Sequence, residues 1–116
     1  MMDVRCKRIY DPPDGNDGQR VLVDRLWPRG IARNRAALDL WLREIAPSDA
    51  LRRWFAHSPD RYAEFAARYR DELTSLPEET ALLRRMAAEG RLTLLYAARD
   101  TEHNNAHVLA DWLNGL

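Results

Sequence analysis

Cysteine is nearly absent from this sequence: Cys6 is the only one among 116 residues. A single cysteine excludes a disulfide within the chain and a zinc site built from four cysteines. Together with an N-terminus that lacks an apolar secretory segment, it predicts a reducing, cytoplasmic location. No apolar run approaches the roughly 20 residues of a membrane-spanning helix, so no membrane association is expected.

An excess of charge of either sign is also missing. Lys and Arg number 18, Asp and Glu number 18, and the formal net charge is zero. This balance argues against a protein that coats duplex nucleic acid through many phosphate contacts, although it allows a local basic site. There is no glycine-rich phosphate loop, and the histidines at 57, 103 and 107 do not form a zinc motif with a glutamate between two of them. No metal site is therefore predicted, and no cofactor follows from the sequence.

What the chain does contain is typical of one globular domain, spanning residues 1–116, with 46% hydrophobic and 31% charged residues. β-rich apolar runs predict strands at 4–9, 20–26 and 92–97. Apolar spacing and capping residues predict helices at 35–45, from Ser48, from Ser58-Pro59, over 77–90 and over 105–115. This order favours a small α/β layer. The loop 11–18 is too short for a helical crossover, so the first two strands are either a hairpin or parallel neighbours with an irregular connection.

The segment "VDRLWPRG" (23–30) places two arginines where the second predicted strand ends. Arginine is suited to bind carboxylate or phosphate groups, and ligands of open α/β sheets lie beyond the carboxyl ends of the strands. Pro28 and Gly30 indicate a shaped loop, so Arg25 and Arg29 are candidate anion ligands. The alternative is structural: an ion pair with Asp24, Asp39 or Glu44. Asp24 is a poor partner for Arg25 if the strand stays regular, because neighbouring side chains alternate between faces.

A second polar segment, "YAARDTEHNNAH" (96–107), follows the third predicted strand and leads into the last helix. Asp100, His103 and Asn104 are candidate ligand-binding residues, because the unpaired N–H groups of a helix N-terminus favour anions. The alternative is structural: the asparagines are helix caps, and Asp100 is an ordinary loop residue. His57 precedes another helix and is the candidate acid or base, since histidine titrates near neutrality. The alternative is structural, since a lone histidine before a helix is more often a hydrogen-bonding residue of the fold.

Four segments together resemble the YeaO-like family of small prokaryotic proteins of unknown function: "KRIYD", "DGQRVLVDRLWPRG", "IAPSDALRRWFAHSPDRYAEFAARYRDEL" and "LTLLYAARDTEHNNAHVLADWL". The resemblance covers nearly the whole chain. It implies a compact, layered, Rossmann-like α/β domain with a small, mainly parallel sheet flanked by helices, and it implies no known reaction. The wider superfamily opens its last helix with a Cys-His-Arg-like triplet. This chain has "HNNA" there, so a cysteine nucleophile cannot be carried over.

Three functional hypotheses follow. The first is a domain that binds or processes a small anionic, phosphorylated or nucleotide-like ligand at an arginine-lined cleft. The second is a non-catalytic sensing or interaction module, whose arginines are structural or hold a nucleic-acid phosphate. The third is a partner-binding protein, which would gain weight if several of the four tryptophans (27, 41, 54 and 112) were exposed. We expect most of them to be core. The sequence decides neither whether the protein is an enzyme nor its oligomeric state.

Overall fold

The computed structural model describes residues 2–115 as a four-stranded sheet with helices packed against it. The strands are β1 (Val4–Arg8), β2 (Gln19–Leu22), β3 (Leu40–Trp41) and β4 (Leu92–Tyr96). Their order is β1-β4-β2-β3, and every neighbouring pair is parallel. The predicted α/β class and the three predicted strands are confirmed. The connection between the first two strands is neither of the alternatives above: β1 and β2 are parallel, but β4 lies between them.

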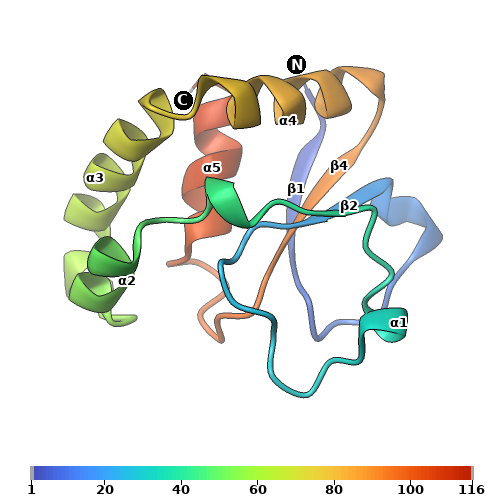
Figure 1. Ribbon diagram of the computed structural model, residues 1–116, viewed down its shortest axis with the longest axis horizontal. Coiled ribbons are helices and arrows are strands. Elements are labelled where there is room, and N and C mark those ends of the chain that lie inside the picture. The colour runs from blue at the N-terminus through green and yellow to red at the C-terminus, as the bar shows by residue number, and fades with distance from the viewer. Residues whose placement is uncertain (1, 116) are drawn as a thin grey trace.

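The helices cover the two faces of the sheet unequally. They are α1 (Arg33–Ala36), α2 (Asp49–Phe55), α3 (Tyr62–Thr74), α4 (Pro77–Glu89) and α5 (Asn105–Leu113). Single 3-10 turns occur at η1 (Gly15–Asp17), η2 (Arg43–Ile45) and η3 (Pro59–Arg61). In Figure 1, α2, α3 and α5 lie on the left, α4 runs across the top, and α1 lies apart at the lower right. Ser48 caps α2 as predicted, and Asn104, one of the two asparagines considered as caps, caps α5.

The core divides into a large and a small cluster, one on each side of the sheet. In β4, Leu92, Leu94 and Tyr96 belong to the large cluster, which the helices α2 to α5 complete. Leu95 points the other way and joins Ile9, Leu22 and Ala36 in the small cluster. This alternation is what a strand covered on both faces requires.

The predicted helix at 35–45 is wrong. Leu38, Trp41, Leu42 and Ile45 have helical spacing, but they do not share a face: Leu38 and Trp41 pack on the small cluster, whereas Leu42 and Ile45 belong to the large one. The segment instead forms the end of α1, the short strand β3 and η2. Residues 40 to 42 alternate between the two clusters, as an extended chain does.

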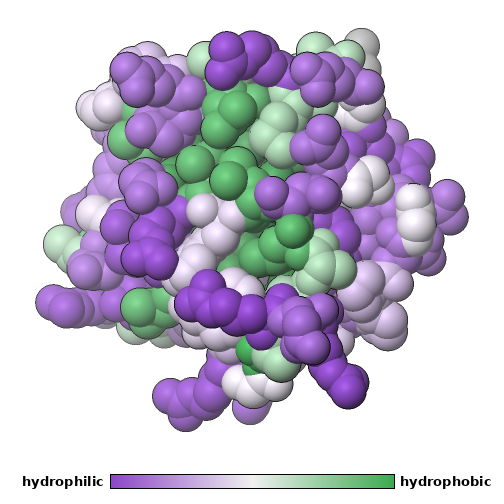
Figure 2. Space-filling model, turned by 45° about the vertical axis from the view of Figure 1, so that its right-hand side comes forward, coloured by the Kyte–Doolittle hydropathy of each residue, from purple (hydrophilic) through white to green (hydrophobic). Residues whose placement is uncertain are grey.

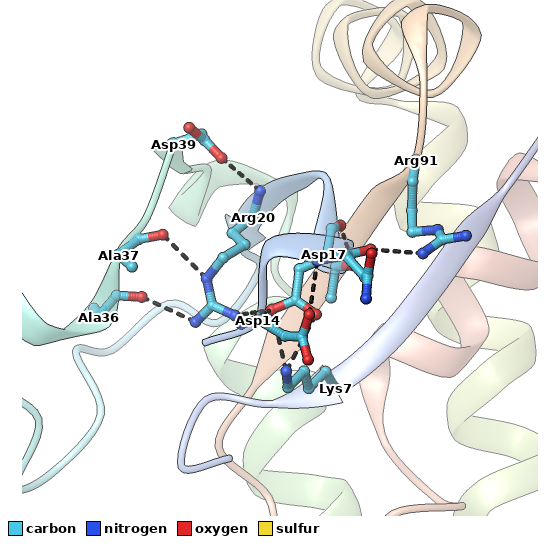
Figure 3. Close-up of polar contacts among 10 residues, drawn as sticks. Lys7, Asp14, Asp17, Arg20, Ala36, Ala37, Asp39 and Arg91 are labelled. Carbon is cyan, nitrogen blue, oxygen red and sulfur yellow. Dashed lines mark hydrogen bonds and ion pairs between the residues drawn. The ribbon is translucent and has the colours of Figure 1, made fainter. Parts of the chain in front are cut away.

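A buried arginine ties this extended segment to the sheet (Figure 3). Arg20, which is 5% exposed, donates through Nε to Ala37 O at 3.0 Å and through Nη2 to Ala36 O at 2.9 Å. Its Nη1 donates to Asp17 Oδ2 at 2.5 Å, and its backbone N–H donates to Asp39 Oδ2 at 2.8 Å. Two carbonyls at the end of α1 are thus satisfied by a side chain from β2, and this competes directly with continuing the helix.

The four tryptophans are all half-buried, so the expectation that most are core is only partly right. Each packs on a core cluster. Each also has a guanidinium over its ring: Arg33 over Trp27, Arg43 over Trp41, Arg68 over Trp54 and Arg84 over Trp112. These cation–π contacts cover the outer part of the rings. They remove the observation that would have favoured a tryptophan-based partner interface.

The surface is mixed. Figure 2 shows a face on which apolar residues gather near the centre within a ring of hydrophilic ones. The large apolar side chains that are most exposed are Tyr10 and Leu26, the latter 62% exposed. None of the helices within residues 2–115 combines the length and apolar character needed to span a bilayer.

Candidate functional site

A cavity of about 750 Å³ lies at the edge of the sheet where the strands end. Because the sheet is parallel, the carboxyl ends of its strands meet there. Residues 24–29 after β2, residues 97–100 after β4, and Tyr10 after β1 all line the cavity. Asn105, the first residue of α5, also lines it. The volume lies within the usual range for small-molecule sites.

The walls are largely apolar and aromatic. Those side chains come from the loop after β2, from the segment before α2, and from α2 and α3, and include Leu26, Trp27, Pro28, Ala46, Phe55 and Phe65. The charged residues are Asp24, Arg25, Arg29, Arg52, Arg99 and Asp100. A mostly apolar pocket with a few polar groups is the usual form of a site for an organic ligand.

The first predicted anion ligand, Arg25, is already engaged within the protein. Its Nη2 donates to Ala46 O at 3.3 Å and to Pro47 O at 3.4 Å, and its Nε lies 3.7 Å from Asp49 Oδ1. Asp49 also pairs with Arg52 at 3.4 Å. The structural alternative is therefore partly right for Arg25, although its carboxylate partner is Asp49 and none of the three carboxylates considered from the sequence.

Arg29 lies on a shaped loop and is exposed. Its carbonyl accepts a hydrogen bond from Tyr10 Oη at 2.8 Å, Trp27 Nε1 donates to Ile31 O at 2.7 Å, and Gly30 takes a positive φ of 81°. These contacts fix the backbone around Pro28, which is buried. The guanidinium of Arg29 makes no hydrogen bond or ion pair with residues 2–115. The same holds for Arg99, which follows β4 and lines the same cavity.

The Asp24 carboxylate forms part of the cavity wall. Its Oδ2 accepts from the backbone N–H of Ala97 at 2.9 Å, and its Oδ1 accepts from Asn105 Nδ2 at 3.2 Å. The strand ends at Leu22, so the expected alternation of side chains does not extend to Asp24. Burial raises the pKa of Asp24, while its two hydrogen bonds and the nearby His57 charge act in the lowering direction and offset only part of this effect.

The segment after β4 is only partly in the cavity. Asp100 lines it, and hydrogen bonds from the backbone N–H groups of Glu102 and His103 lower the pKa of Asp100. His103 and Asn104 are not among the lining residues. His103 Nδ1 lies 2.9 Å from Asp100 Oδ2, and its ring packs edge-on against Tyr62. Asn104 is 2% exposed, and its side chain accepts from His107 N and donates to Asp100 O.

Asn104 therefore acts as a helix cap, as the structural alternative proposed. His103 contacts Asp100 but does not line the cavity. Any direct contact of these two side chains with a ligand stays a prediction. His57, by contrast, lines the cavity. It follows α2 with a left-handed backbone, φ 55°, directly after Ala56 at φ 47°. Two such residues in succession are uncommon outside glycine, and they turn the chain so that His57 reaches the cavity. An acid–base role for His57 stays a prediction.

Sequence reasoning missed several lining residues. Arg99 could have been found, because it follows the third predicted strand as Arg25 follows the second. Asn105 was considered only as a cap. Arg52 carries no local signal, since it lies on a helix whose position relative to the sheet depends on tertiary packing. Within the part of the chain described, no group of His, Cys, Asp and Glu side chains is arranged to hold a metal ion.

Fold and cavity together define a class: a small α/β domain with a parallel sheet and a basic, apolar-walled cleft at the carboxyl ends of its strands. The chain belongs to the family whose model is described as the inactive DUF488-N3 subclade, which matches residues 3–116. It is 49% identical over 115 residues to the uncharacterised protein YeaO of Escherichia coli, covering 99% of this chain and all of that protein. The YeaO-like resemblance of the sequence is therefore confirmed.

Two mycobacterial proteins are also similar to this chain over nearly its whole length. The uncharacterised protein Rv3073c of Mycobacterium tuberculosis is 43% identical over 112 residues, covering 97% of this chain and 94% of that protein. The uncharacterised protein Mb3100c of Mycobacterium bovis matches to the same extent. No solved structure matches this chain at a significant level.

Proposed function

We propose that this protein binds a small organic anion, phosphorylated or nucleotide-like, in the cavity at the carboxyl edge of the sheet. The observation that carries the proposal is the pair Arg29 and Arg99. Both line the cavity, both are exposed, and neither guanidinium is engaged by another residue between 2 and 115. Guanidinium groups in a partly apolar cleft are the preferred protein ligands of phosphate and carboxylate.

Two further features support an anion at this place. The N-terminus of α5 opens at the cavity, where its unpaired N–H groups contribute partial positive charge. Arg25 and Arg52 add positive charge that Asp49 only partly offsets, since the two guanidinium groups share that single carboxylate. The apolar walls fit the organic part of such a ligand better than a simple inorganic ion.

The single cysteine remains the basis for a proposed cytoplasmic location.

Binding without turnover is the form of the proposal that we favour. The description of the family as inactive agrees with it. The start of α5 offers asparagines where the wider superfamily has a cysteine. Processing of the ligand is a second candidate, supported by His57 on the cavity wall and by the raised pKa of Asp24 nearby. The second candidate would be favoured if the wild type converted a ligand and the His57→Gln variant still bound that ligand without converting it.

The test is calorimetric titration of the full chain with phosphate, pyrophosphate and nucleoside monophosphates. We expect at least one of the organic phosphates to bind. Arg29→Ala and Arg99→Ala should each weaken its binding by about 1.5–3 kcal/mol, the usual value for a hydrogen bond to a charged group. Arg85→Ala is the matched control, because Arg85 is an exposed arginine on α4 that does not line the cavity. Equal binding by all four proteins, or none by the wild type, would contradict the proposal.

A further inference from the structure

The carboxylate of Asp24 lies on the cavity wall near His57 but forms no ion pair with the residues between 2 and 115. No Lys, Arg or His nitrogen among residues 2–115 lies within 4.0 Å of it. The adjacent Arg25 directs its guanidinium elsewhere, to Ala46 O, Pro47 O and Asp49. A buried charge is costly unless it is paired or fully hydrogen-bonded, so this carboxylate has capacity left for a donor.

Asn105 adds a second hydrogen-bond acceptor to the same wall of the cavity. Both hydrogens of its amide nitrogen are used, one on Val23 O at 3.1 Å and one on Asp24 Oδ1 at 3.2 Å. The amide oxygen of Asn105 therefore remains as an acceptor, and no residue between 2 and 115 donates to it. Asp24 and Asn105 are held together by their mutual hydrogen bond, and both line the cavity.

The cavity thus has two chemically opposite parts. Arg29 and Arg99 offer only donors, whereas Asp24 and Asn105 offer acceptors. A ligand with an anionic group and nothing else would satisfy the arginines, and it would offer no donor to the lone pairs of Asp24 that Ala97 and Asn105 leave free. Apolar side chains, among them Leu26, Phe55 and Phe65, line the rest of the cavity and suit a hydrocarbon or aromatic body.

We infer that the ligand carries an N–H donor group, such as an amine or amidine, in addition to its anionic group, and that Asp24, supported by Asn105, selects for this donor. The inference rests on the proposed anion site and names the chemical class of its ligand. Asp24 is then the specificity-determining residue, and Arg29 and Arg99 supply the affinity that all anions share. In agreement, burial raises the pKa of Asp24, as expected for a carboxylate whose hydrogen bonds do not fully compensate its desolvation.

Two probes that differ by one donor test the inference on the wild-type chain. Phenyl phosphate supplies the anion and the aromatic body, and 4-aminophenyl phosphate adds an N–H donor at the far end of the same ring. We expect the amino compound to bind at least about tenfold more tightly, as follows from a hydrogen bond to a charged acceptor. Asp24→Asn should weaken the amino compound selectively and bring the two affinities together, because an amide accepts less strongly and carries no charge.

The possible results distinguish the selection of a donor group by Asp24 from the binding of an anion by Arg29 and Arg99. If phenyl phosphate binds and the amino group adds nothing, the donor-selecting role of Asp24 is wrong and the anion site stands. If neither compound binds the wild type, both the inference and this anion site are wrong. Thermal unfolding of Asp24→Asn shows whether the variant is folded, and the comparison of the two probes on the wild type does not depend on that variant.

Discussion

Gly18 shows how strictly one residue is specified in this fold. It ends η1 with a φ of 66°, and a Cβ atom added there would lie 2.2 Å from Arg91 O. Both the backbone conformation and the space therefore exclude a side chain. That close approach also brings Gln19 N to 3.0 Å from Arg91 O, the hydrogen bond that starts the pairing of β2 with β4.

Gly18→Ala should destabilise the protein by about 2 kcal/mol or more, since a positive φ and a backbone clash both penalise alanine. Gly15→Ala is the control: Gly15 lies three residues away, and nothing lies within 4 Å of an added Cβ. It should change stability by less than about 1 kcal/mol in either direction. Urea unfolding of the two variants measures both, and equal losses would contradict the argument.

At the scale of elements, the segment from α1 to β3 depends on Arg20 more than on its own sequence. Helix α1 has four residues and no side-chain cap, and β3 has two residues. Neither is stable alone. Arg20 supplies the donors for Ala36 O and Ala37 O and the pairing with Asp39. We therefore expect this segment to order only when β2 is in place.

Arg20→Met should lower the free energy of unfolding by about 3–5 kcal/mol, because it removes the closer of the two cationic partners of Asp17 and leaves two carbonyls without their side-chain donor. Arg5→Met is the matched variant, since Arg5 also lies on a strand and pairs with an aspartate, but at an exposed position. It should cost far less. Hydrogen exchange should show residues 33–41 losing protection first in Arg20→Met. Unchanged protection there would mean that Arg20 does not hold the segment.

This dependence also explains which parts of the fold the sequence predicts. The buried strands, the proline-initiated helices and the caps of α2 and α5 carry local signals, and they were predicted close to where the structure has them, although β2 ends four residues before the predicted residue 26. The segment 35–45 has helical spacing by coincidence, and its true conformation follows from contacts with Arg20, which is distant in the chain. The order of the strands was not predictable either, because no local signal shows that β4 separates β1 from β2.

In the candidate site, too, the features with a local sequence signal were predicted, and those set by distant contacts were not. Arg25, Arg29 and Asp100 were found because they follow strands, and the ends of parallel strands meet. Whether each side chain is engaged within the protein could not be predicted: Asp49, on a different element, decides that for Arg25. Asp24 was overlooked as a cavity residue because β2 was expected to continue to residue 26. It ends at Leu22, and the chain then turns toward the cavity.

For the molecule as a whole, stability should fall in acid. Hydrogen bonds and ion pairs lower the pKa of Asp3, Asp17 and Asp100; in Asp17, burial acts in the raising direction but is outweighed by the Asp14 N–H, Lys7 and Arg20. A carboxyl with a lowered pKa contributes stability above its unfolded value of 3.8, and this contribution is lost as the pH falls through the folded pKa. Asp24, whose pKa is raised, has the opposite sign and gains stability on protonation.

The melting temperature should therefore decrease as the pH falls below about 4, where the unfolded carboxyls take up protons. Lys7→Met removes a donor 3.1 Å from Asp17, so the pKa of Asp17 should be less depressed and the decrease should be shallower. Arg53→Met, at an exposed position without such a partner within residues 2–115, should follow the wild-type slope. Parallel curves for wild type and Lys7→Met would contradict this account.

The position of β4 in the sheet has a consequence for how the chain acquires its structure during synthesis. Among residues 2–115, β4 is the strand that pairs with both β1 and β2, and it is also the last strand to be made. Until it arrives, β1 and β2 have a gap between them of about 10 Å, twice the spacing of neighbouring strands. A nascent chain on the ribosome therefore cannot close its sheet until residues 92–96 have left the exit tunnel. A chain truncated before β4 would expose unpaired strand edges to its neighbours.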